Sequence, residues 1–169
     1  MTSTPDNVEY KGTCHCGRFQ FKLHLFRPLE AVHACHCTLC AKKGYLWLFP
    51  AEQEFQVTRG AGELVCYDSG NDGHEKHMVT LHGDENLTEY RFGRGFTGHQ
   101  FCKICGVQLS MKLHGPPQSV VDNLPLEKQE IVKQKLVIVP IRVAVLDGVE
   151  LADLKIERTD EGTEGYVVD

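Results

Sequence analysis

Polar and hydrophobic residues alternate along several segments of the chain, which is the pattern of a β-strand with one buried face. Residues 18–25 (RFQFKLHL) place an apolar side chain at every second position, and residues 107–113 alternate in the same way. The short apolar run at 45–49 (YLWLF), closed by Pro50, predicts a fully buried strand. Further strands are predicted at 63–67, 76–82, 89–92 and 135–146, where Pro140 indicates an edge position or a bulge.

Helical patterns are scarce. Residues 126–135 (LEKQEIVKQK) predict one short helix, and residues 149–154 predict a single turn after the Asp-Gly turn signal at 147–148. Stretches rich in Gly, Pro and polar residues predict loops at 69–74 and 115–125. The pattern therefore indicates a mainly β fold with little helix. We expect a single domain over residues 10–156, between a flexible N-terminal tail at 1–9 and a flexible C-terminal tail at 157–169.

Composition agrees with a soluble globular protein of about one domain. The chain has 169 residues, of which 41% are hydrophobic and 24% are charged. Its formal net charge of −5 argues against a general nucleic-acid binder, which would carry a basic surface. No apolar run approaches the ~18 residues of a membrane span, and the polar first ten residues do not resemble a secretory signal. These features predict a cytoplasmic protein.

Cysteines change this picture most, because seven of the eight fall into three tight clusters. Two pairs, CxC and CxxC, flank a central trio with the spacing CxCxxC. Such spacings suit the convergence of thiolates on a metal ion better than a dense disulfide framework, and a reducing cytosol keeps thiols free. We therefore expect metal sites rather than structural disulfides. The two pairs are Cys14 with Cys16 and Cys102 with Cys105; the trio is Cys35, Cys37 and Cys40.

The two outer pairs together supply four ligands, enough to close a tetrahedral zinc site. Each pair is followed by a glycine, Gly17 or Gly106, as expected where the backbone takes a positive φ after a metal-binding turn. Joining the pairs closes a loop of roughly ninety residues, so this zinc would stabilise the fold against chain entropy. The alternative is that these four cysteines are ordinary packing residues.

The central trio supplies only three ligands, which leaves one zinc position open for water or a substrate thiol. We interpret Cys35, Cys37 and Cys40 as catalytic residues of a second zinc site. Two alternatives remain. The trio could be a closed structural site with Cys66, His33 or His36 as fourth ligand, or a metal-free, redox-active group of low-pKa thiols. Outside such a role, Cys66 is most simply a buried apolar residue.

Other residues near the clusters are ambiguous. Lys42 and Lys43 follow the trio and could attract an anionic substrate or simply be solvated. Arg91 and Arg94 carry the same ambiguity. Trp47 is expected in the core, and His99 could face either the open site or solvent.

The order CxCG, CxCxxC, FCxxCG resembles the glutathione-dependent formaldehyde-activating enzyme family, also called the centromere protein V family. Segments that carry the resemblance are CTLCAKKGYL (37–46), YRFGRGFTGHQFCKICGVQL (90–109) and VPIRVAVLDGVEL (139–151). It spans residues from about 10 to 154. The resemblance implies a β-tent fold with two zinc ions, one structural at Cys14, Cys16, Cys102 and Cys105 and one at Cys35, Cys37 and Cys40, where glutathione acts.

The function implied by the resemblance is a carbon–sulfur lyase that adds glutathione to formaldehyde and gives S-hydroxymethylglutathione. The leading hypothesis is that a zinc-activated thiolate attacks the aldehyde carbon, with water or His99 as the acid. Alternatives are a thiol carrier, an exchange factor, or a non-catalytic zinc module for a protein or chromatin partner, which would add a nuclear location. The expected partners are thus a small thiol and an aldehyde, with nucleic acid and membrane disfavoured.

Overall fold

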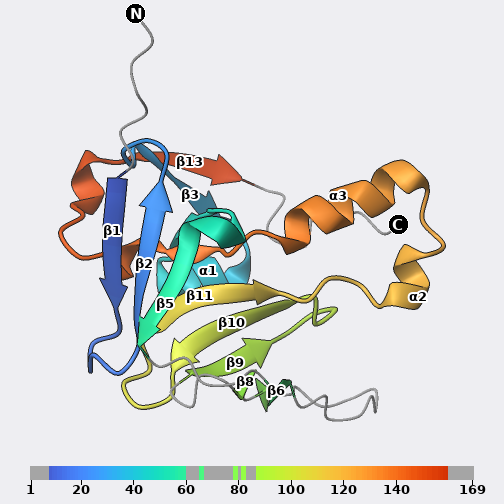
Figure 1. Ribbon diagram of the computed structural model, residues 1–169, viewed down its shortest axis with the longest axis horizontal. Helices are drawn as coiled ribbons and strands as arrows, with labels where there is room; N and C mark the ends of the chain where they lie inside the picture. The colour runs from blue at the N-terminus through green and yellow to red at the C-terminus, as the bar shows by residue number, and fades with distance from the viewer. Residues whose placement is uncertain (1–7, 60–64, 67–77, 80, 83–86, 160–169) are drawn as a thin grey trace, which may run out of the picture.

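The computed structural model describes residues 8–59, 65–66, 78–79, 81–82 and 87–159 (Figure 1). Within these residues the protein is mainly β, as the alternating pattern predicted. The strands are β1 Val8–Thr13, β2 Gln20–Leu25, β3 Ala31–Cys35, β4 Leu46–Leu48, β5 Phe55–Arg59, β6 Val65–Cys66, β7 Met78–Val79, β8 Leu81–His82, β9 Leu87–Arg91, β10 Thr97–Cys102, β11 Gln108–Leu113, β12 Ile141–Arg142 and β13 Lys155–Thr159.

Helices are short apart from one. They are α1 Thr38–Lys43, α2 Gln118–Val121 and α3 Leu126–Leu136, with 3₁₀ turns η1 Glu52–Glu54, η2 Val143–Val145 and η3 Leu151–Asp153. The helix predicted at 126–135 and the turn predicted at 149–154 are therefore confirmed. Among the helices that the structure describes, none is both long enough and apolar enough to span a bilayer.

Two sheets form the main framework. The smaller has the order β1-β2-β5 and is antiparallel throughout. The larger has the order β13-β3-β4-β12-β11-β10-β9-β7, and only its β13–β3 pair is parallel. Strands β6 and β8 form a separate pair. In Figure 1, β1, β2 and β5 stand on one side of the molecule, while α2 and α3 extend from the end of β11 on the other.

The hydrophobic core is formed by the side chains on the inward faces of these strands. On β2 and the turn before it, Phe19, Phe21 and Leu23 are each at most 2% exposed. Burial of each such side chain stabilises the fold by about 1.5–3 kcal/mol. The same cluster contains Leu109 of β11 and Ile141 of β12 from the larger sheet, so both sheets share one core. Two of the cysteines predicted to bind metal, Cys14 and Cys102, belong to this cluster and are at most 1% exposed.

The prediction of one long strand at 135–146 is wrong. Only Ile141–Arg142 is a strand; α3 continues to Leu136, and Val143–Val145 forms a 3₁₀ turn. This run is apolar because the core buries Val143 and Val145, and burial alone does not distinguish a strand from a turn. Pro140 is also not at an edge. It directly precedes β12, an interior strand, where the missing N–H is tolerated and its carbonyl accepts the Met111 amide at 2.8 Å.

Other boundaries differ from the expectation. The predicted loop at 115–125 contains α2, and helix α1 was not predicted. Strand β1 begins at Val8, inside the expected N-terminal tail, and β13 extends to Thr159, inside the expected C-terminal tail. The loop predicted at 69–74 and the rest of both tails lie outside the described residues.

Candidate metal centres

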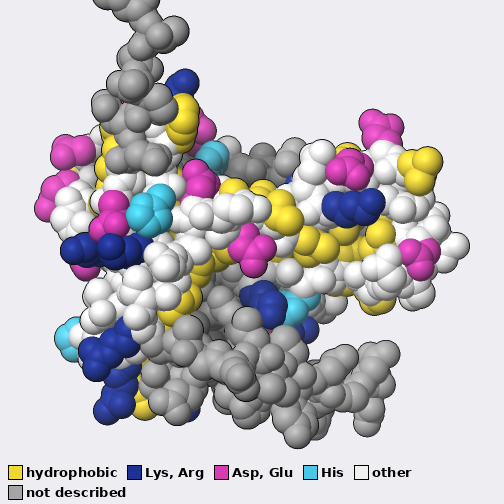
Figure 2. Space-filling model, viewed as in Figure 1, with side chains coloured by type: hydrophobic (Ala, Val, Ile, Leu, Met, Phe, Trp, Pro, Cys, Tyr) yellow, Lys and Arg dark blue, Asp and Glu magenta, His cyan; other side chains and the backbone are white. Residues whose placement is uncertain are grey.

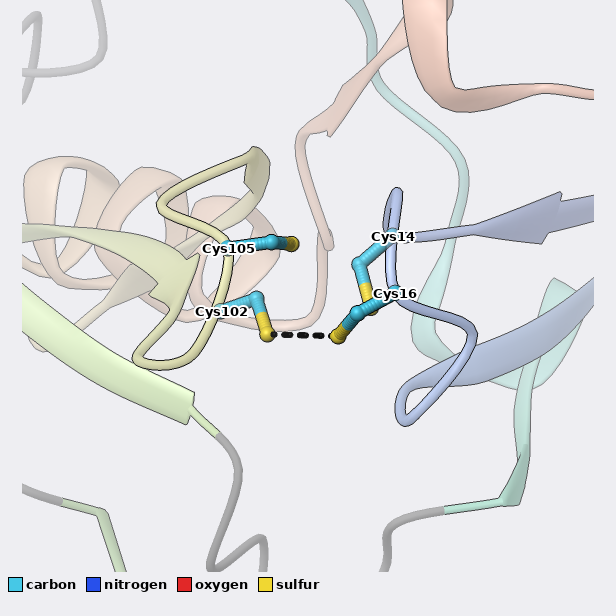
Figure 3. A group of neighbouring side chains, drawn as sticks. All are labelled: Cys14, Cys16, Cys102 and Cys105. Atoms are coloured by element: carbon cyan, nitrogen blue, oxygen red, sulfur yellow. Dashed lines mark hydrogen bonds between the residues drawn. The ribbon is translucent and has the colours of Figure 1, made fainter.

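Four cysteines from two distant turns meet at one point. Cys14 and Cys16 lie in the turn between β1 and β2, and Cys102 and Cys105 lie at the end of β10 and in the turn that follows. Their sulfur atoms all lie within 4.8 Å of one another. Figure 3 shows the two pairs facing each other across this gap. The structure thus brings together the four residues that the sequence predicted as a closed group.

Distances between these sulfur atoms fit a tetrahedral zinc site. Cys14 Sγ lies 3.5 Å from Cys16 Sγ, and Cys16 Sγ lies 3.6 Å from Cys102 Sγ. A zinc ion with Zn–S bonds of about 2.3 Å separates its tetrahedral sulfur ligands by about 3.8 Å. The observed separations are far too long for disulfides, whose sulfur atoms are about 2.05 Å apart. The four thiols are free and suitably spaced to bind a metal ion.

Both turns have the backbone geometry expected of metal-binding turns. Gly17 has φ = 68° and Gly106 has φ = 70°, a region that only glycine adopts cheaply. Each turn is closed by the glycine amide, which donates to the carbonyl of Cys14 at 2.9 Å or of Cys102 at 2.7 Å. In the first turn the Phe19 amide also donates to Cys14 Sγ at 3.3 Å. The glycine amides thus close the turns, and the Phe19 amide directs partial positive charge at the sulfur of Cys14.

The thiols of this group differ in acidity. Burial raises the pKa of Cys102 to about 12. Burial also acts to raise the pKa of Cys105, but the amides of Val107 and Cys16 and the neighbouring thiols outweigh it, and the pKa falls to about 6. One thiolate is therefore favoured at neutral pH, and binding of a cation would favour ionisation of the others.

The central trio lies where β3 runs into α1. Cys35 is the last residue of β3, Cys37 is the N-cap of α1, and Cys40 lies within that helix. The helix ends after six residues because Gly44 takes a left-handed C-cap conformation at φ = 62°. This strand–cap–helix path brings the three sulfur atoms within 4.8 Å of one another. Convergence of the three sulfur atoms is therefore confirmed, at a strand–helix junction rather than on a turn between strands.

Hydrogen bonds to sulfur hold the trio in place. The Cys37 amide donates to Cys35 Sγ and the Cys40 amide donates to Cys37 Sγ, each at 3.4 Å. The indole Nε1–H of Trp47, from β4, donates to Cys40 Sγ at 3.3 Å. Trp47 was expected only in the core; it is fully buried, but it also contacts a candidate metal ligand.

Acidity within the trio is also divided. The neighbouring Cys40 thiol and the Cys37 amide lower the pKa of Cys35 to about 5, against an opposing effect of burial. The interaction with Cys35, together with burial, raises the pKa of Cys40. The opposite pKa shifts of Cys35 and Cys40 suit a site that a metal cation completes.

An aromatic cluster packs against Cys40 through Tyr45 and Trp47. The Tyr45 and Trp47 rings meet edge to face with centroids 5.3 Å apart. His99 of β10 stacks between Phe92 and Tyr45, with centroid distances of 5.6 and 6.4 Å. His99 is 3% exposed, so it faces this cluster rather than solvent, and burial lowers its pKa to about 4. At neutral pH it is uncharged.

Other sequence candidates lie elsewhere. Among the described side chains, neither His33 nor His36 belongs to the trio's ligand group, whereas the side chain of Cys66 lies outside the described residues. Lys42 and Lys43 are exposed at the end of α1. Arg91 donates from Nε to the buried Glu89 at 2.6 Å, in a network with His114 that the sequence did not indicate.

Comparison with known proteins gives two findings. Residues 9–77 match the family model described as glutathione-dependent formaldehyde-activating enzyme, a range that includes Cys14, Cys16 and the whole trio. The crystal structure of a Rhodobacter sphaeroides protein, a structural-genomics target, superposes with a TM-score of 0.55 at 22% identity, covering 87% of this chain and 99% of that chain. The second finding shows likeness of fold alone. The first finding shows that the N-terminal part of the chain is similar to the glutathione-dependent formaldehyde-activating enzyme family.

Proposed function

We propose that this protein is a zinc-dependent enzyme of the carbon–sulfur lyase type, which adds a thiol, glutathione in the first instance, to formaldehyde. The observation that carries the proposal is the convergence of Cys35, Cys37 and Cys40 as three free thiols with no fourth described ligand. The family match supports glutathione and formaldehyde as substrates.

We assign the four-cysteine group to a structural zinc and the trio to a zinc site that faces substrate. The donor sets fit, because zinc binds thiolates and catalytic zinc commonly has three protein ligands. A zinc ion held by the trio supplies a Lewis acid that favours the deprotonated form of a substrate thiol. The amides of Cys37 and Cys40 and the indole of Trp47 orient the three sulfur atoms.

The reaction itself is balanced without a co-reactant. The substrate thiol loses its proton, its sulfur forms a bond to the aldehyde carbon, and the C=O π electrons become a lone pair on oxygen. That oxygen then takes a proton and gives the S-hydroxymethyl adduct. Because burial keeps His99 neutral at pH 7, water is a better proton source for this step than His99.

Exchange kinetics test the proposal. The uncatalysed addition is already easy, so the useful quantity is the exchange rate between ¹³C-formaldehyde and its glutathione adduct at equilibrium, measured by NMR magnetisation transfer. We expect the zinc-loaded protein to accelerate exchange and folded Cys37→Ser to lose the acceleration. Exchange no faster with the wild-type protein than with buffer would refute catalysis, and glutathione binding without acceleration would indicate a thiol carrier.

A Cys66→Ser variant separates the closed-site alternative from the proposal. If the trio has an open position, Cys66→Ser keeps two zinc ions per chain and full exchange activity. If Cys66 were a fourth ligand, the same variant would bind the second zinc more weakly. Zinc content and exchange rate measured on the same preparation distinguish the two outcomes.

A further inference from the structure

Arg142 lies on the larger sheet, two strands from β3, the strand that ends in Cys35 of the trio. It belongs to β12, which runs between β4 and β11. In the antiparallel register of β12 and β4, Arg142 is directly opposite Trp47. Side chains of directly opposed residues leave the same face of a sheet, with Cβ atoms about 4.5–5.5 Å apart. Arg142 is therefore a neighbour of the residue that donates a hydrogen bond to Cys40 Sγ.

The Arg142 guanidinium stacks on Tyr45. Its Cζ atom lies 5.1 Å from the centroid of the Tyr45 ring. Tyr45 is also anchored to the trio, since its amide donates to the Cys40 carbonyl at 3.0 Å. Both residues that Arg142 adjoins thus hydrogen-bond to Cys40, Tyr45 from its backbone amide to the carbonyl and Trp47 from its indole to the sulfur. This arrangement holds the guanidinium next to the site where the substrate thiol would react.

Within the described part of the chain, Arg142 has no counterion. Among the described residues, no carboxylate pairs with it, and its buried Nε has no hydrogen-bond partner. A buried guanidinium Nε without an acceptor is costly, because burial removes water from this donor without replacing its hydrogen bond. Arg91, which is also half-buried, differs in that its Nε donates a hydrogen bond to Glu89. An anion that accepts from Arg142 would remove this cost.

We propose that Arg142 binds a carboxylate of the thiol substrate and so sets the specificity of the trio site for carboxylate-bearing thiols. The inference rests on the proposed function, in which the trio receives the substrate thiol. A guanidinium presents its donors in a planar fork that matches a carboxylate, and stacking on Tyr45 fixes the plane of that fork. The carboxylate anchors at Arg142 while the sulfur reaches the trio.

Two small thiols of similar size test this assignment. Mercaptoacetate carries a carboxylate, and 2-mercaptoethanol carries a neutral hydroxyl. Binding of each to the zinc-loaded protein is measured by titration calorimetry, a readout that does not require catalysis. We expect Arg142→Gln to weaken mercaptoacetate binding roughly 10- to 100-fold, the range for loss of a charged hydrogen-bonded contact, and to change 2-mercaptoethanol binding little.

Two further variants serve as controls. Arg142→Lys keeps the charge but loses the fork, so it should fall between the wild-type protein and Arg142→Gln. Lys43→Gln removes an exposed charge three residues beyond Cys40 and should shift mercaptoacetate binding much less, because exposed charges are screened. Zinc content and circular dichroism establish that each variant is folded.

The outcomes separate the inference from the proposed function. If Arg142→Gln weakened the binding of both thiols equally, Arg142 would only support Tyr45. If it weakened the binding of neither thiol, Arg142 would contact no substrate. Either result would overturn the inference. A wild-type protein that binds mercaptoacetate through Arg142 but does not accelerate exchange would refute the catalytic function and leave the carboxylate site standing.

Discussion

Within each cysteine group, one thiol is acidified and another is made less acidic. In the trio the pKa of Cys35 falls to about 5 while that of Cys40 rises, and in the four-cysteine group the pKa of Cys105 falls to about 6 while that of Cys102 rises to about 12. In the trio, neighbouring donors stabilise the Cys35 thiolate, and its interaction with Cys40 opposes ionisation of that thiol, whereas burial is the largest cause of the raised pKa of Cys102. A bound cation removes this opposition, which is why these groups suit metal binding better than isolated thiol chemistry.

Trp47→Phe tests the role of a single hydrogen bond in the trio. The change removes the indole donor to Cys40 Sγ and keeps an aromatic ring in the core. Donors to metal ligands commonly alter metal affinity by about 10- to 100-fold, so we expect zinc at the trio to bind roughly tenfold more weakly. Competition with a chromophoric chelator measures this affinity.

Tyr45→Phe is the matched control. Its hydroxyl donates to Gln108 Oε1 at 3.1 Å and not to sulfur, so its removal should leave the zinc affinity of the trio near the wild-type value. If both variants weakened zinc binding at the trio equally, general loosening of the aromatic cluster would explain the effect. The indole–sulfur hydrogen bond would then have no specific role.

At the scale of elements, α1 and the short strands around it determine where the sulfur atoms of the trio lie. The sequence pattern predicted these elements poorly. Cysteine spacing alone predicted which sulfur atoms converge, because ligands two or three residues apart meet on any tight turn. It did not predict the six-residue helix, which is too short to show a hydrophobic period. The Trp47 and Arg142 neighbourhood depends on the pairing of β4 with β12, segments almost a hundred residues apart, which no local pattern encodes.

The arm formed by α2 and α3 packs on the β9–β10 turn through a second, small core. Val132 of α3 is 2% exposed and packs with Phe96 and Val121. In Figure 2 the surface of this arm shows hydrophobic side chains interspersed with charged ones. Leu126, at the start of α3, is 82% exposed. Val132 and Leu126 therefore allow a buried and an exposed side chain to be shortened in the same helix.

Val132→Ala should lower the free energy of unfolding by about 1–3 kcal/mol, since it removes buried methyl groups and leaves a cavity. Leu126→Ala should change it by less than about 0.5 kcal/mol, as expected of an exposed position. Neither should alter zinc content, because the arm contributes no described metal ligand. Chemical denaturation checks both, and a greater loss from Leu126→Ala would show that the exposed face of α3 is covered in solution.

Across the whole molecule, the two candidate metal sites have different positions in the fold. The four-cysteine group joins the β1–β2 turn of the smaller sheet to the β10–β11 turn of the larger one, and two of its members lie in the shared core. Loss of this site should separate the sheets. The trio lies entirely within the β3–α1 segment of the larger sheet, so its loss should leave the framework intact.

Zinc content per chain, measured together with circular dichroism on wild type, Cys37→Ser and Cys14→Ser, tests this division most directly. We predict two zinc ions in the wild-type protein and one in a folded Cys37→Ser that no longer accelerates thiol–aldehyde exchange. Cys14→Ser should be unfolded or insoluble. One zinc ion in both wild type and Cys37→Ser, or a stable and well-folded Cys14→Ser, would contradict the assignment of one structural and one substrate-facing site.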